Sequence, residues 1–518
     1  MMSQQFDWQP RVPAMRALVT ALLQETPVVY AAGGVVRDAL LGIDKKVTDL
    51  DLVVAEAALP LARRVADRQG WAYYPLDEAR DVARLVFTAN QGEPYVCDIA
   101  RIRGEDIGED LRTRDFTVNA MAFELRSGAP TRLIDVSGGQ EDLAAKRLRR
   151  VTAAAFADDP ARLLRAVRLA VQFGFELDAQ TDEQIRRMAT TVKLVSPERQ
   201  RDEIWKMLVG PRPEQAIALL HNLGLLALVL PEVAKLDGVA QSFPHYTDVF
   251  THTLRVMAHA DAIRAWLRAE RVDDPPRTMW QATLLPWRDE LRRHFMQPTV
   301  GGRRRVDWLI GYALFHDVGK SVTRTVESDS EGGVRYRFFT HDQIGAEMTA
   351  ARLDALRFSR YEITLAAAVV RAHMRPHLLD ADFTHAPISR RAIYRFFQDA
   401  GEARFDATPG VDTLLLAMAD YQAIHEAAVP ARWDEYLEHI SQMLEYAFAP
   451  DGLRKTEQEP LLDGHALIAE LGMEPGPGIG ALLRYVAEAQ AAGEVSTRTE
   501  ALSLAEARLA LVAEANGN

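Results

Sequence analysis

The sequence changes character near residue 140. Up to that point, short runs of β-branched and aromatic residues alternate with helical patterns, and the runs lie at residues 27–31, 48–54, 83–88, 95–102, 120–125 and 132–134. After Glu141, apolar residues recur almost throughout at helical spacing. This change predicts an α+β protein in which a domain built on a sheet precedes helical domains.

The length indicates several domains. At roughly 100 to 200 residues per domain, a chain of 518 residues is expected to have three or four. We place them at residues 1–145, 146–240, 241–450 and 451–518. Within the third, an irregular insertion rich in Arg is expected near residues 265–306, and a polar segment with glycines at 327–333 predicts the tip of a hairpin.

Charge and hydropathy exclude some classes of protein. The formal net charge is −12, which argues against a uniformly basic protein that binds nucleic acid without regard to sequence. Positive charge is nevertheless clustered, because residues 263–306 hold ten Arg against five acidic residues. No apolar run is long enough for a membrane span. The single cysteine, Cys97, and the absence of a secretory signal pattern favour a cytoplasmic location.

A pair of glycines follows the first predicted strand. Gly33 and Gly34 lie between this strand and a helix, so backbone amides there can approach a phosphate closely, with Arg37 supplying positive charge. A tight turn without a ligand is the simpler interpretation of the pair taken alone.

Three aspartates are candidates for catalysis and metal binding. Asp49 and Asp51 are two positions apart in a predicted strand, so their side chains are expected to share one face. Adjacent carboxylates repel each other unless a cation lies between them, and the arrangement suits Mg²⁺ bound together with substrate phosphates. Asp98, in a neighbouring strand, is the candidate third carboxylate. The alternatives are a solvated strand end for the pair and an ordinary polar position for Asp98.

A charged segment before the next strand carries three candidate nucleotide contacts. Arg114 can meet a triphosphate. Asp115 and Asn119 can either contact a ribose or hold their own loop by local hydrogen bonds.

The helix predicted at residues 160–173 has a stripe of arginines. Arg162, Arg165 and Arg168 are three residues apart and therefore lie on one side of the helix. Asp159 and Arg162 offer an acceptor and a planar donor fork, which can pair with the edge of a base. A solvated helix face is the alternative.

Five segments in this order resemble the class II nucleotidyltransferases, which comprise the CCA-adding enzymes and the bacterial poly(A) polymerases. The segments are residues 30–42, 49–51, 114–120, 158–168 and 196–199. The resemblance implies a polymerase-β-like head at residues 1–145, followed by a mostly helical body at 146–240. It further implies that Mg²⁺ is held by Asp49 and Asp51.

The same resemblance implies roles for the other candidates. Nucleotide or its phosphates would be contacted by Gly34, Arg37, Arg114, Arg165 and Arg168. The incoming base would pair with Asp159 and Arg162, which select C or A without a template. The implied partners are CTP, ATP and the 3′ end of tRNA.

One feature departs from the typical pattern of CCA-adding members. Only twelve residues separate Arg101 from Arg114, where such members carry a longer flexible loop that is thought to help the switch from C to A. The short connection resembles the CC-adding branch of the family. The acidic net charge weighs against a processive poly(A) polymerase.

Histidines and aspartates form a second constellation in the helical part of the chain. They are His252, His316, Asp317, His341, His373 and Asp420. Imidazoles and carboxylates gathered from separate helices commonly bind divalent metals and activate water at a phosphate ester. Each histidine alone is more often an ordinary capping or core residue.

The order of these residues resembles the HD phosphohydrolase superfamily, for which His316-Asp317 followed by Gly319-Lys320 is the most specific piece. The resemblance implies an all-α HD domain at residues 241–450 that binds a transition metal or Mg²⁺. His341 and His373 would complete a second metal position. It also implies phosphatase and 2′,3′-cyclic phosphodiesterase activity. The insertion would be either an RNA-contacting element or an exposed helical hairpin.

Three hypotheses follow, and all leave the oligomeric state open. The first is a tRNA nucleotidyltransferase that adds C and/or A, or CC only, joined to a metal-dependent phosphohydrolase. In the second, the HD half binds little metal and serves as a structural RNA-binding body. The third is a poly(A) polymerase, which would make long tails from ATP alone.

Overall fold

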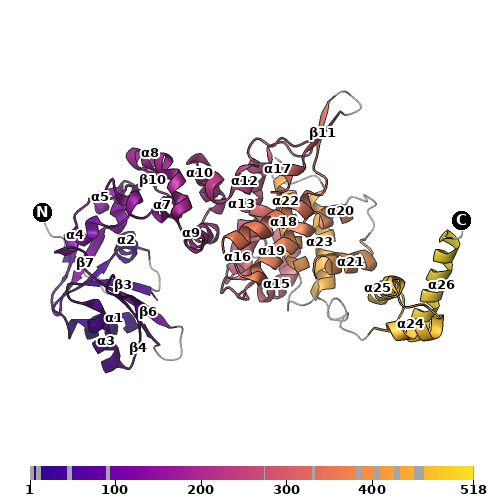
Figure 1. The fold of residues 1–518 in the computed structure, drawn as a ribbon, viewed down its shortest axis with the longest axis horizontal. Coiled ribbons are helices and arrows are strands. Elements are labelled where there is room, and N and C mark those ends of the chain that lie inside the picture. The colour runs from indigo at the N-terminus through magenta and orange to yellow at the C-terminus, as the bar shows by residue number, and fades with distance from the viewer. Residues whose placement is uncertain are drawn as a thin grey trace. The chain divides into compact units, whose positions relative to one another are not determined.

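The computed structural model describes residues 5–6, 13–43, 49–88, 94–272, 275–328, 333–380, 387–401, 409–424, 432–448 and 460–516. The chain divides into two compact units, one of Met1–Glu203 with Asn222–Leu228 and one of Ile204–His221 with Val229–Asn518. Strands gather in the first unit and helices dominate the second (Figure 1), which confirms the predicted α+β class. Within the described ranges, no helix combines the length and apolar character that crossing a bilayer requires.

The first unit is built on an eight-stranded mixed sheet. Its strands, in spatial order, are β1 (Gln5–Phe6), β8 (Thr131–Asp135), β7 (Met121–Leu125), β2 (Val29–Ala32), β3 (Asp49–Val54), β6 (Tyr95–Arg101), β5 (Val82–Phe87) and β4 (Ala72–Asp77). Among the described strands of this sheet, β3 and β6 are the only pair that runs parallel. The edge strands β1 and β4 were not among the predicted strands. β4 is mostly exposed and so lacks the alternating pattern of a half-buried strand.

Strand alternation decides which face of the sheet carries the acidic residues. Leu50 and Leu52 in β3 are each 1% exposed, and Asp51 between them points to the opposite face. The register of the parallel pair sets Asp51 opposite Asp98 in β6. These two aspartates therefore share a face of the sheet, and Asp98 lies in a strand next to that of Asp51 as expected.

Helices complete the first unit. They include α1 (Pro13–Leu23), α2 (Gly34–Leu40), α3 (Ala58–Gln69), α4 (Ile107–Arg112), α5 (Gly139–Ala144), α6 (Ala155–Asp158), α7 (Ala161–Phe173) and α8 (Ala179–Met188). Helix α9 (Pro197–Val209) begins in this unit. Helix α3 packs on β4, β5 and β6. Helix α7 buries its apolar side, including Leu163, Leu164 and Val167, which leaves the arginine stripe for other contacts.

The second unit is centred on five mutually packed helices. They are α13 (Val249–Arg268), α16 (Arg305–Phe315), α18 (His341–Ala355), α19 (Arg360–Ala372) and α22 (Pro409–Ile424). Around them lie α10 (Pro213–Asn222), α17 (Lys320–Thr323), α20 (Arg375–Asp380), α21 (Arg390–Asp399) and α23 (Trp433–Phe448). Every residue of α16 is buried, which explains why its sequence is mainly apolar on all sides, and its two charged residues, Arg305 and Asp307, form ion pairs.

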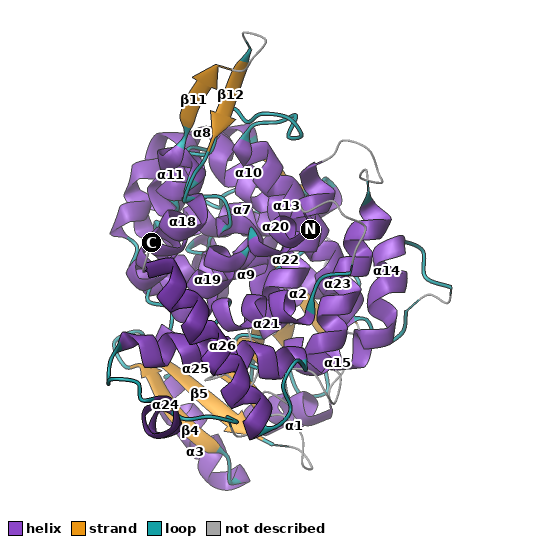
Figure 2. Ribbon diagram, turned by 90° about the vertical axis from the view of Figure 1, so that its right-hand side faces the viewer, coloured by secondary structure: helices purple, strands orange, loops and turns teal. Residues whose placement is uncertain are grey.

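Two appendages extend the helical unit. The predicted hairpin is present as β11 (Thr325–Ser328) and β12 (Val334–Arg337), and it projects beyond the helices (Figure 2). The C-terminal segment forms α24 (Gly464–Leu471), α25 (Pro477–Ala492) and α26 (Arg498–Asn516). These last helices share a small hydrophobic core of their own.

The Arg-rich insertion is fixed to the helical unit rather than exposed as a hairpin. It contains α14 (Met279–Leu284) and α15 (Arg288–Phe295). Arg288 and Arg292 donate to backbone carbonyls at the C-terminal end of α13, with Arg292 Nη1 2.7 Å from the Ala269 oxygen. Trp280 is 6% exposed and packs edge-on against Trp266. These contacts correct the expectation of an exposed helical hairpin, because the arginines satisfy carbonyls left unpaired at a helix end.

The end of the insertion carries a buried ionic cluster. Asp412 of α22 accepts hydrogen bonds from Arg305 Nη2 at 2.7 Å and from the Tyr312 hydroxyl at 3.2 Å, and His294 Nε2 lies 2.8 Å away. Burial alone would raise the pKa of Asp412, but Arg305 and His294 bring it from 3.8 down to about 2. The cluster therefore holds Asp412 ionised inside the core.

This cluster predicts a pH-dependent stability. We expect Asp412→Asn to lower the free energy of unfolding by about 3 kcal/mol at neutral pH, because it breaks a buried pair. The folded-state pKa lies below the unfolded one, so the ionised group stabilises the fold above about pH 4 and loses this effect as the pH falls towards 2. Urea unfolding of both proteins should show the difference shrinking by about 2 kcal/mol over that range. A difference independent of pH would contradict the assignment.

Candidate functional site

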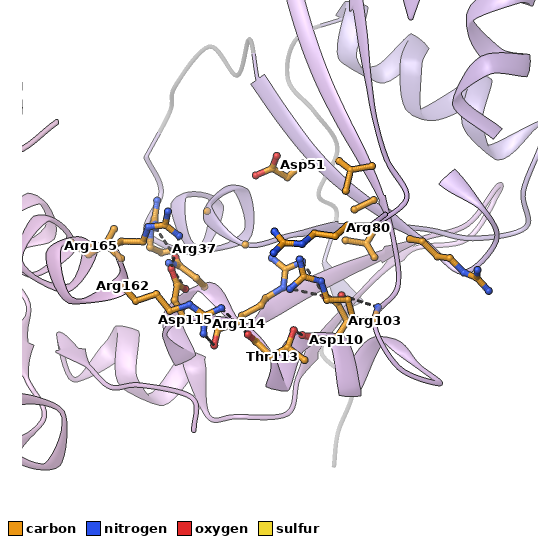
Figure 3. A pocket seen from close by; sticks show the side chains of 18 of the residues that line it. Arg37, Asp51, Arg80, Arg103, Asp110, Thr113, Arg114, Asp115, Arg162 and Arg165 are labelled. Atoms are coloured by element: carbon orange, nitrogen blue, oxygen red, sulfur yellow. Dashed lines mark hydrogen bonds and ion pairs between the residues drawn. The ribbon is translucent and has the colours of Figure 1, made fainter. Parts of the chain in front are cut away.

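The Asp51 face of the sheet opens into a polar cavity of about 450 Å³, a size typical of small-molecule sites. Its charged lining consists of Arg37, Arg80, Arg101, Arg103, Arg114, Arg162, Arg165, Arg168, Asp51, Asp110 and Asp115. Arginines stand on either side of Asp51 (Figure 3). Eight cations against three carboxylates suit a ligand that carries several negative charges, such as a polyphosphate.

Gly33 has a conformational reason to be glycine. Its φ is +87°, and a Cβ there would lie 3.0 Å from Arg114 Nη1. A side chain would thus strain the backbone and crowd an arginine of the cavity. The predicted glycine pair stands where β2 passes into α2, with Gly33 and Gly34 both lining the cavity.

Arg37 is held rigidly at the cavity wall. Its Nη1 donates to Asn119 Oδ1 at 2.6 Å, and its Nη2 donates to Asp38 Oδ1 at 2.7 Å. The guanidinium lies 4.2 Å from the centroid of the Phe173 ring. Burial lowers the pKa of Arg37, and the charge of Asp38 opposes that shift. A fixed cation of this kind is preorganised for an anionic ligand.

Asp115 and Asn119 connect the elements around the cavity. Asn119 Nδ2 donates to Asp115 Oδ1 at 3.2 Å, and Arg165 Nη1 donates to Asp115 Oδ2 at 3.2 Å. Because Asn119 also accepts from Arg37, the pair links α2 to α7. The loop-holding alternative from the sequence is therefore present in the structure, and a ribose contact by either residue stays a prediction.

Glu203 is a functional residue that sequence reasoning missed. It is 4% exposed and accepts from Arg168 Nε at 2.8 Å and from Arg165 Nε at 3.3 Å. The buried carboxylate of Glu203 thus orients two arginines of the stripe. The available signal was its place next to Ile204 of α9, which is buried. An acidic side chain that faces the core needs a partner of opposite charge.

Of the two other predicted carboxylates, Asp98 is paired with an arginine. Asp98 accepts a fork from Arg84, with oxygens 2.7 and 2.8 Å from Nε and Nη2, and it is not among the residues that line the cavity. A metal at Asp98 would have to displace Arg84. Asp49 begins β3, but its side chain lies outside the described residues. The catalytic roles of Asp49, Asp51 and Asp98 stay predictions.

The proposed base-reading pair is engaged within the protein. Asp159 Oδ2 accepts from Arg199 Nη2 at 2.7 Å. Burial would raise the pKa of Asp159, yet the hydrogen bond from Arg199 brings the net shift downward. Arg162 lines the cavity and donates to the Thr113 carbonyl at 2.9 Å. Arg199 therefore positions Asp159, and base recognition stays a prediction.

The second constellation converges in the helical unit as predicted. Two groups of potential metal ligands share Asp317, namely His252 with His316 and His341 with His373, and the ligand atoms within each group lie within 4.8 Å of one another. Asp420 joins them, because its Oδ1 is 2.9 Å from His252 Nε2. All six predicted residues are buried.

Backbone carbonyls orient three of these imidazoles. The Nδ1 atoms of His316, His341 and His373 lie 2.9, 2.7 and 2.6 Å from the carbonyl oxygens three residues earlier. A carbonyl can only accept, so each Nδ1 carries a proton, and in the neutral form of each ring the lone pair is on Nε2. This is how proteins commonly fix the tautomer of a metal-binding histidine.

Two nitrogen lone pairs that face each other with no proton between them can both bind a divalent cation. His341 Nε2 and His373 Nε2 face each other at 3.3 Å, and burial lowers the pKa of His373 to about 3. His316 Nε2 and both oxygens of Asp317 form no satisfactory hydrogen bond among the described atoms, although Lys320 Nζ is 2.8 Å from Asp317. Burial would raise the pKa of Asp317, but His316 and Lys320 hold it far below the usual value. Such a donor set is suited to one or two metal ions.

His377 is a second residue that the sequence analysis overlooked. Its Nε2 lies 3.0 Å from Asp420 Oδ2, and its Nδ1 is 3.3 Å from the Tyr436 hydroxyl. It therefore orients Asp420 from the side opposite His252. The signal was a further histidine only four residues after His373.

Family models match three consecutive segments of the chain. They are the poly A polymerase head domain at residues 29–149, a probable RNA- and SrmB-binding site of polymerase A at 174–236, and the HD domain at 249–404. The first covers the cavity residues from Gly33 to Asn119 but not the arginines of α7, and the third covers five of the six clustered metal-ligand candidates.

Comparison with known proteins gives relatives along nearly the whole chain. An A-adding tRNA nucleotidyltransferase of Deinococcus radiodurans is 35% identical, covering 92% of this chain and 94% of the relative. A CC-adding tRNA nucleotidyltransferase of Thermus thermophilus is 34% identical, with coverages of 91% and 92%. A CCA-adding enzyme solved with ATP has the same fold, with a TM-score of 0.60, 19% identity and coverages of 96% and 97%. The chain thus belongs to the family of tRNA nucleotidyltransferases, with an HD domain in its C-terminal half.

Proposed function

We propose that this chain adds two cytidines to the 3′ end of tRNA from CTP in the cytoplasm and stops before adenosine. The observation that carries the choice of nucleotide is the short connection between Arg101 and Arg114. It holds α4, capped by Asp106 whose side chain accepts from the Glu109 amide at 2.8 Å. Asp110 in the same helix accepts from Arg114 at 3.1 Å. The residues between Arg101 and Arg114 thus form a short capped helix, where CCA-adding members carry the longer loop.

The relatives do not decide this point. The A-adding and CC-adding proteins are almost equally similar to the chain, at 35% and 34% identity. The proposal therefore rests on the length and order of the connection rather than on overall similarity.

In the proposed reaction the terminal hydroxyl of tRNA attacks the α-phosphate of CTP, and pyrophosphate leaves. Arg114, Arg165 and Arg168 would hold the triphosphate, since they line the cavity with their guanidinium groups anchored by Asp110, Asp115 and Glu203. Mg²⁺ on Asp49 and Asp51 would lower the pKa of the attacking hydroxyl and stabilise the leaving pyrophosphate. Asp159 and Arg162 would select the base once the base replaces their partners within the protein, the Arg199 side chain and the Thr113 carbonyl.

Incorporation of labelled nucleotides tests the specificity. We expect a tRNA ending at its discriminator base to gain two cytidines from CTP and nothing further when ATP is added. A tRNA ending in CC should stay unextended with ATP, because the switch to adenosine lacks its loop. Gel electrophoresis at single-nucleotide resolution gives the readout.

Two other outcomes of this experiment would overturn the proposal. Completion to CCA would show that another element replaces the loop. Long tails from ATP on an unstructured RNA would favour the poly(A) polymerase hypothesis.

We further propose that the HD half is a metal-dependent phosphohydrolase rather than a structural RNA-binding body. The clustered Nε2 lone pairs of His316, His341 and His373 support this, because such a cluster is unfavourable without a cation. A mainly imidazole donor set favours a transition metal over Mg²⁺. When bound, the metal would activate water at a phosphate ester.

A further inference from the structure

We propose that three exposed aromatic residues beside the HD centre, Phe243, Tyr246 and Phe339, form a stacking platform for the single-stranded end of an RNA. Three arginines would contact its phosphates: Arg255 beside Tyr246, Arg337 beside Phe339, and Arg324 beside the neighbouring Tyr336. The terminal phosphate of the bound strand then enters the metal centre. This inference rests on the proposed hydrolase function of the HD half and adds the surface that would recognise its substrate.

Two chain segments bring the platform to the centre. Lys320, which lies 2.8 Å from Asp317, donates from Nζ to Gln241 Oε1 at 2.8 Å, and this fixes the loop that carries Phe243 and Tyr246. The ring of His245 in the same loop lies 4.9 Å from the ring of His252. The loop therefore contacts two residues of the centre directly.

The second segment is the base of the β11–β12 hairpin. The Tyr336 amide donates to Ser242 Oγ at 2.7 Å, which joins the hairpin to the loop. The carbonyl of Phe338 accepts from His341 Nδ1 at 2.7 Å, and the Phe338 ring lies 5.4 Å from Lys320 Nζ. Phe339 follows directly, so it stands between the hairpin and a metal-ligand candidate.

The exposure of the aromatic rings is unusual for their type. Phe243 is 94% exposed, Phe339 65% and Tyr246 40%. Large apolar side chains that cluster in solvent mark interaction sites. The side of the centre next to these rings is its least buried side, because the side chains of Lys320 and His341 keep 8% and 9% exposure while those of His316 and His373 keep 0% and 1%.

Each kind of side chain on the platform points to RNA as the partner. Arg255 lies 4.7 Å from the Tyr246 ring centroid, Arg337 6.0 Å from that of Phe339, and Arg324 5.7 Å from that of Tyr336. Aromatic rings interleaved with arginines are the composition that binds single strands, because bases stack on the rings and phosphates meet the cations. A purely apolar protein partner would gain nothing from this alternation.

The test uses the full-length protein and a five-nucleotide RNA with a 3′-phosphate. Water attacks the phosphorus, the bond to the ribose 3′ oxygen breaks, and that oxygen leaves with a proton. We expect Phe243→Leu with Phe339→Leu to lower kcat/KM for this RNA about tenfold per ring, mainly through KM. Glycerol 2-phosphate, which has no base, gives the reference, and the ratio of the two kcat/KM values is the readout.

Matched variants separate stacking from simple apolar contact. Phe243→Trp with Phe339→Trp should keep the wild-type ratio, whereas leucine, which is apolar without a flat ring, should not. Tyr74→Leu removes another exposed aromatic, 53% exposed on β4, and should change neither substrate. Arg324→Gln should reduce the slope of log affinity against log salt by about 0.7.

The possible outcomes distinguish this inference from the proposed hydrolase function. The platform is refuted if the leucine variant keeps the wild-type ratio of the two kcat/KM values. It is also refuted if the HD half hydrolyses glycerol 2-phosphate but not the RNA. If neither substrate is hydrolysed, the hydrolase function fails, and photocrosslinking with RNA that carries a terminal 4-thiouridine still decides on the platform. A crosslink to residues 241–246 or 334–341 that the leucine variant loses would support it, and its absence would refute it.

Discussion

The Asp51→Asn variant is expected to lose cytidine incorporation by about a thousandfold or more. Asparagine keeps the size of the side chain but removes the charge on the cavity face of β3, where a cation must be held against the triphosphate. Removing one preorganised electrostatic contact to a transition state typically costs about 10² to 10³ in rate, and losing a metal costs more. Single-turnover incorporation of labelled CTP into tRNA measures the effect.

Two companion variants sharpen this test. Asp67→Asn changes an exposed aspartate of the same unit, on α3 and paired only with Arg63, and should leave incorporation unaltered. Asp98→Asn decides whether the third carboxylate is catalytic. A loss as large as that of Asp51→Asn would assign it to the metal, and a small loss would leave it as the partner of Arg84. Full incorporation by Asp51→Asn would refute the assignment of the head chemistry.

Local patterns were sufficient to place the central strands and most of the site. Gly33, Asp51 and Arg114 each lie in a short motif that spans a single strand, turn or helix. The direction of a side chain within one such element follows from the regular spacing of residues, so it can be predicted from the sequence. The edge strand β4 left no such signal, because most of its residues are exposed.

Residues that act through distant partners were harder to predict. Glu203 aims Arg165 and Arg168, which lie 38 and 35 residues earlier in the chain, and no short motif links them. Arg80 reaches the cavity from the turn between β4 and β5. Its position depends on the sheet order, which pairs these strands at the edge.

The Arg-rich insertion shows why a count of charges misleads. Arg303 and Arg305 look like solvated or RNA-binding residues in the sequence, but they pair with Glu362 and Asp412, which are 0% exposed. Buried carboxylates require such partners. Nothing in a single sequence tells a paired arginine from a free one when the acid lies on another helix.

The two halves offer different ligands to metals. The head presents carboxylates, which suit Mg²⁺ and phosphate oxygens, whereas the HD centre presents mainly imidazole nitrogens. Nucleotide addition and the proposed hydrolysis should therefore require different metals. A variant of one centre should leave the activity of the other intact.

Asp317→Ala is the variant expected to show this most clearly. Asp317 belongs to both groups of metal-ligand candidates, so one substitution weakens both positions. We expect the bound metal to be lost and hydrolysis of glycerol 2-phosphate to fall by about a thousandfold or more, while cytidine incorporation is retained. Inductively coupled plasma mass spectrometry of the purified protein gives the metal content independently of activity.

A thermal shift experiment links that metal to the fold. A cation that binds only the folded state stabilises it by about 2.7 kcal/mol at a hundred times its Kd, so added metal should raise the Tm of the wild-type protein but not that of Asp317→Ala. His465→Ala removes an exposed histidine on α24 and should behave like the wild type. Because the donor set of the centre is complete without any residue of the head, retained metal in Asp317→Ala, or an equal loss in His465→Ala, would mean that the cation binds elsewhere in the chain.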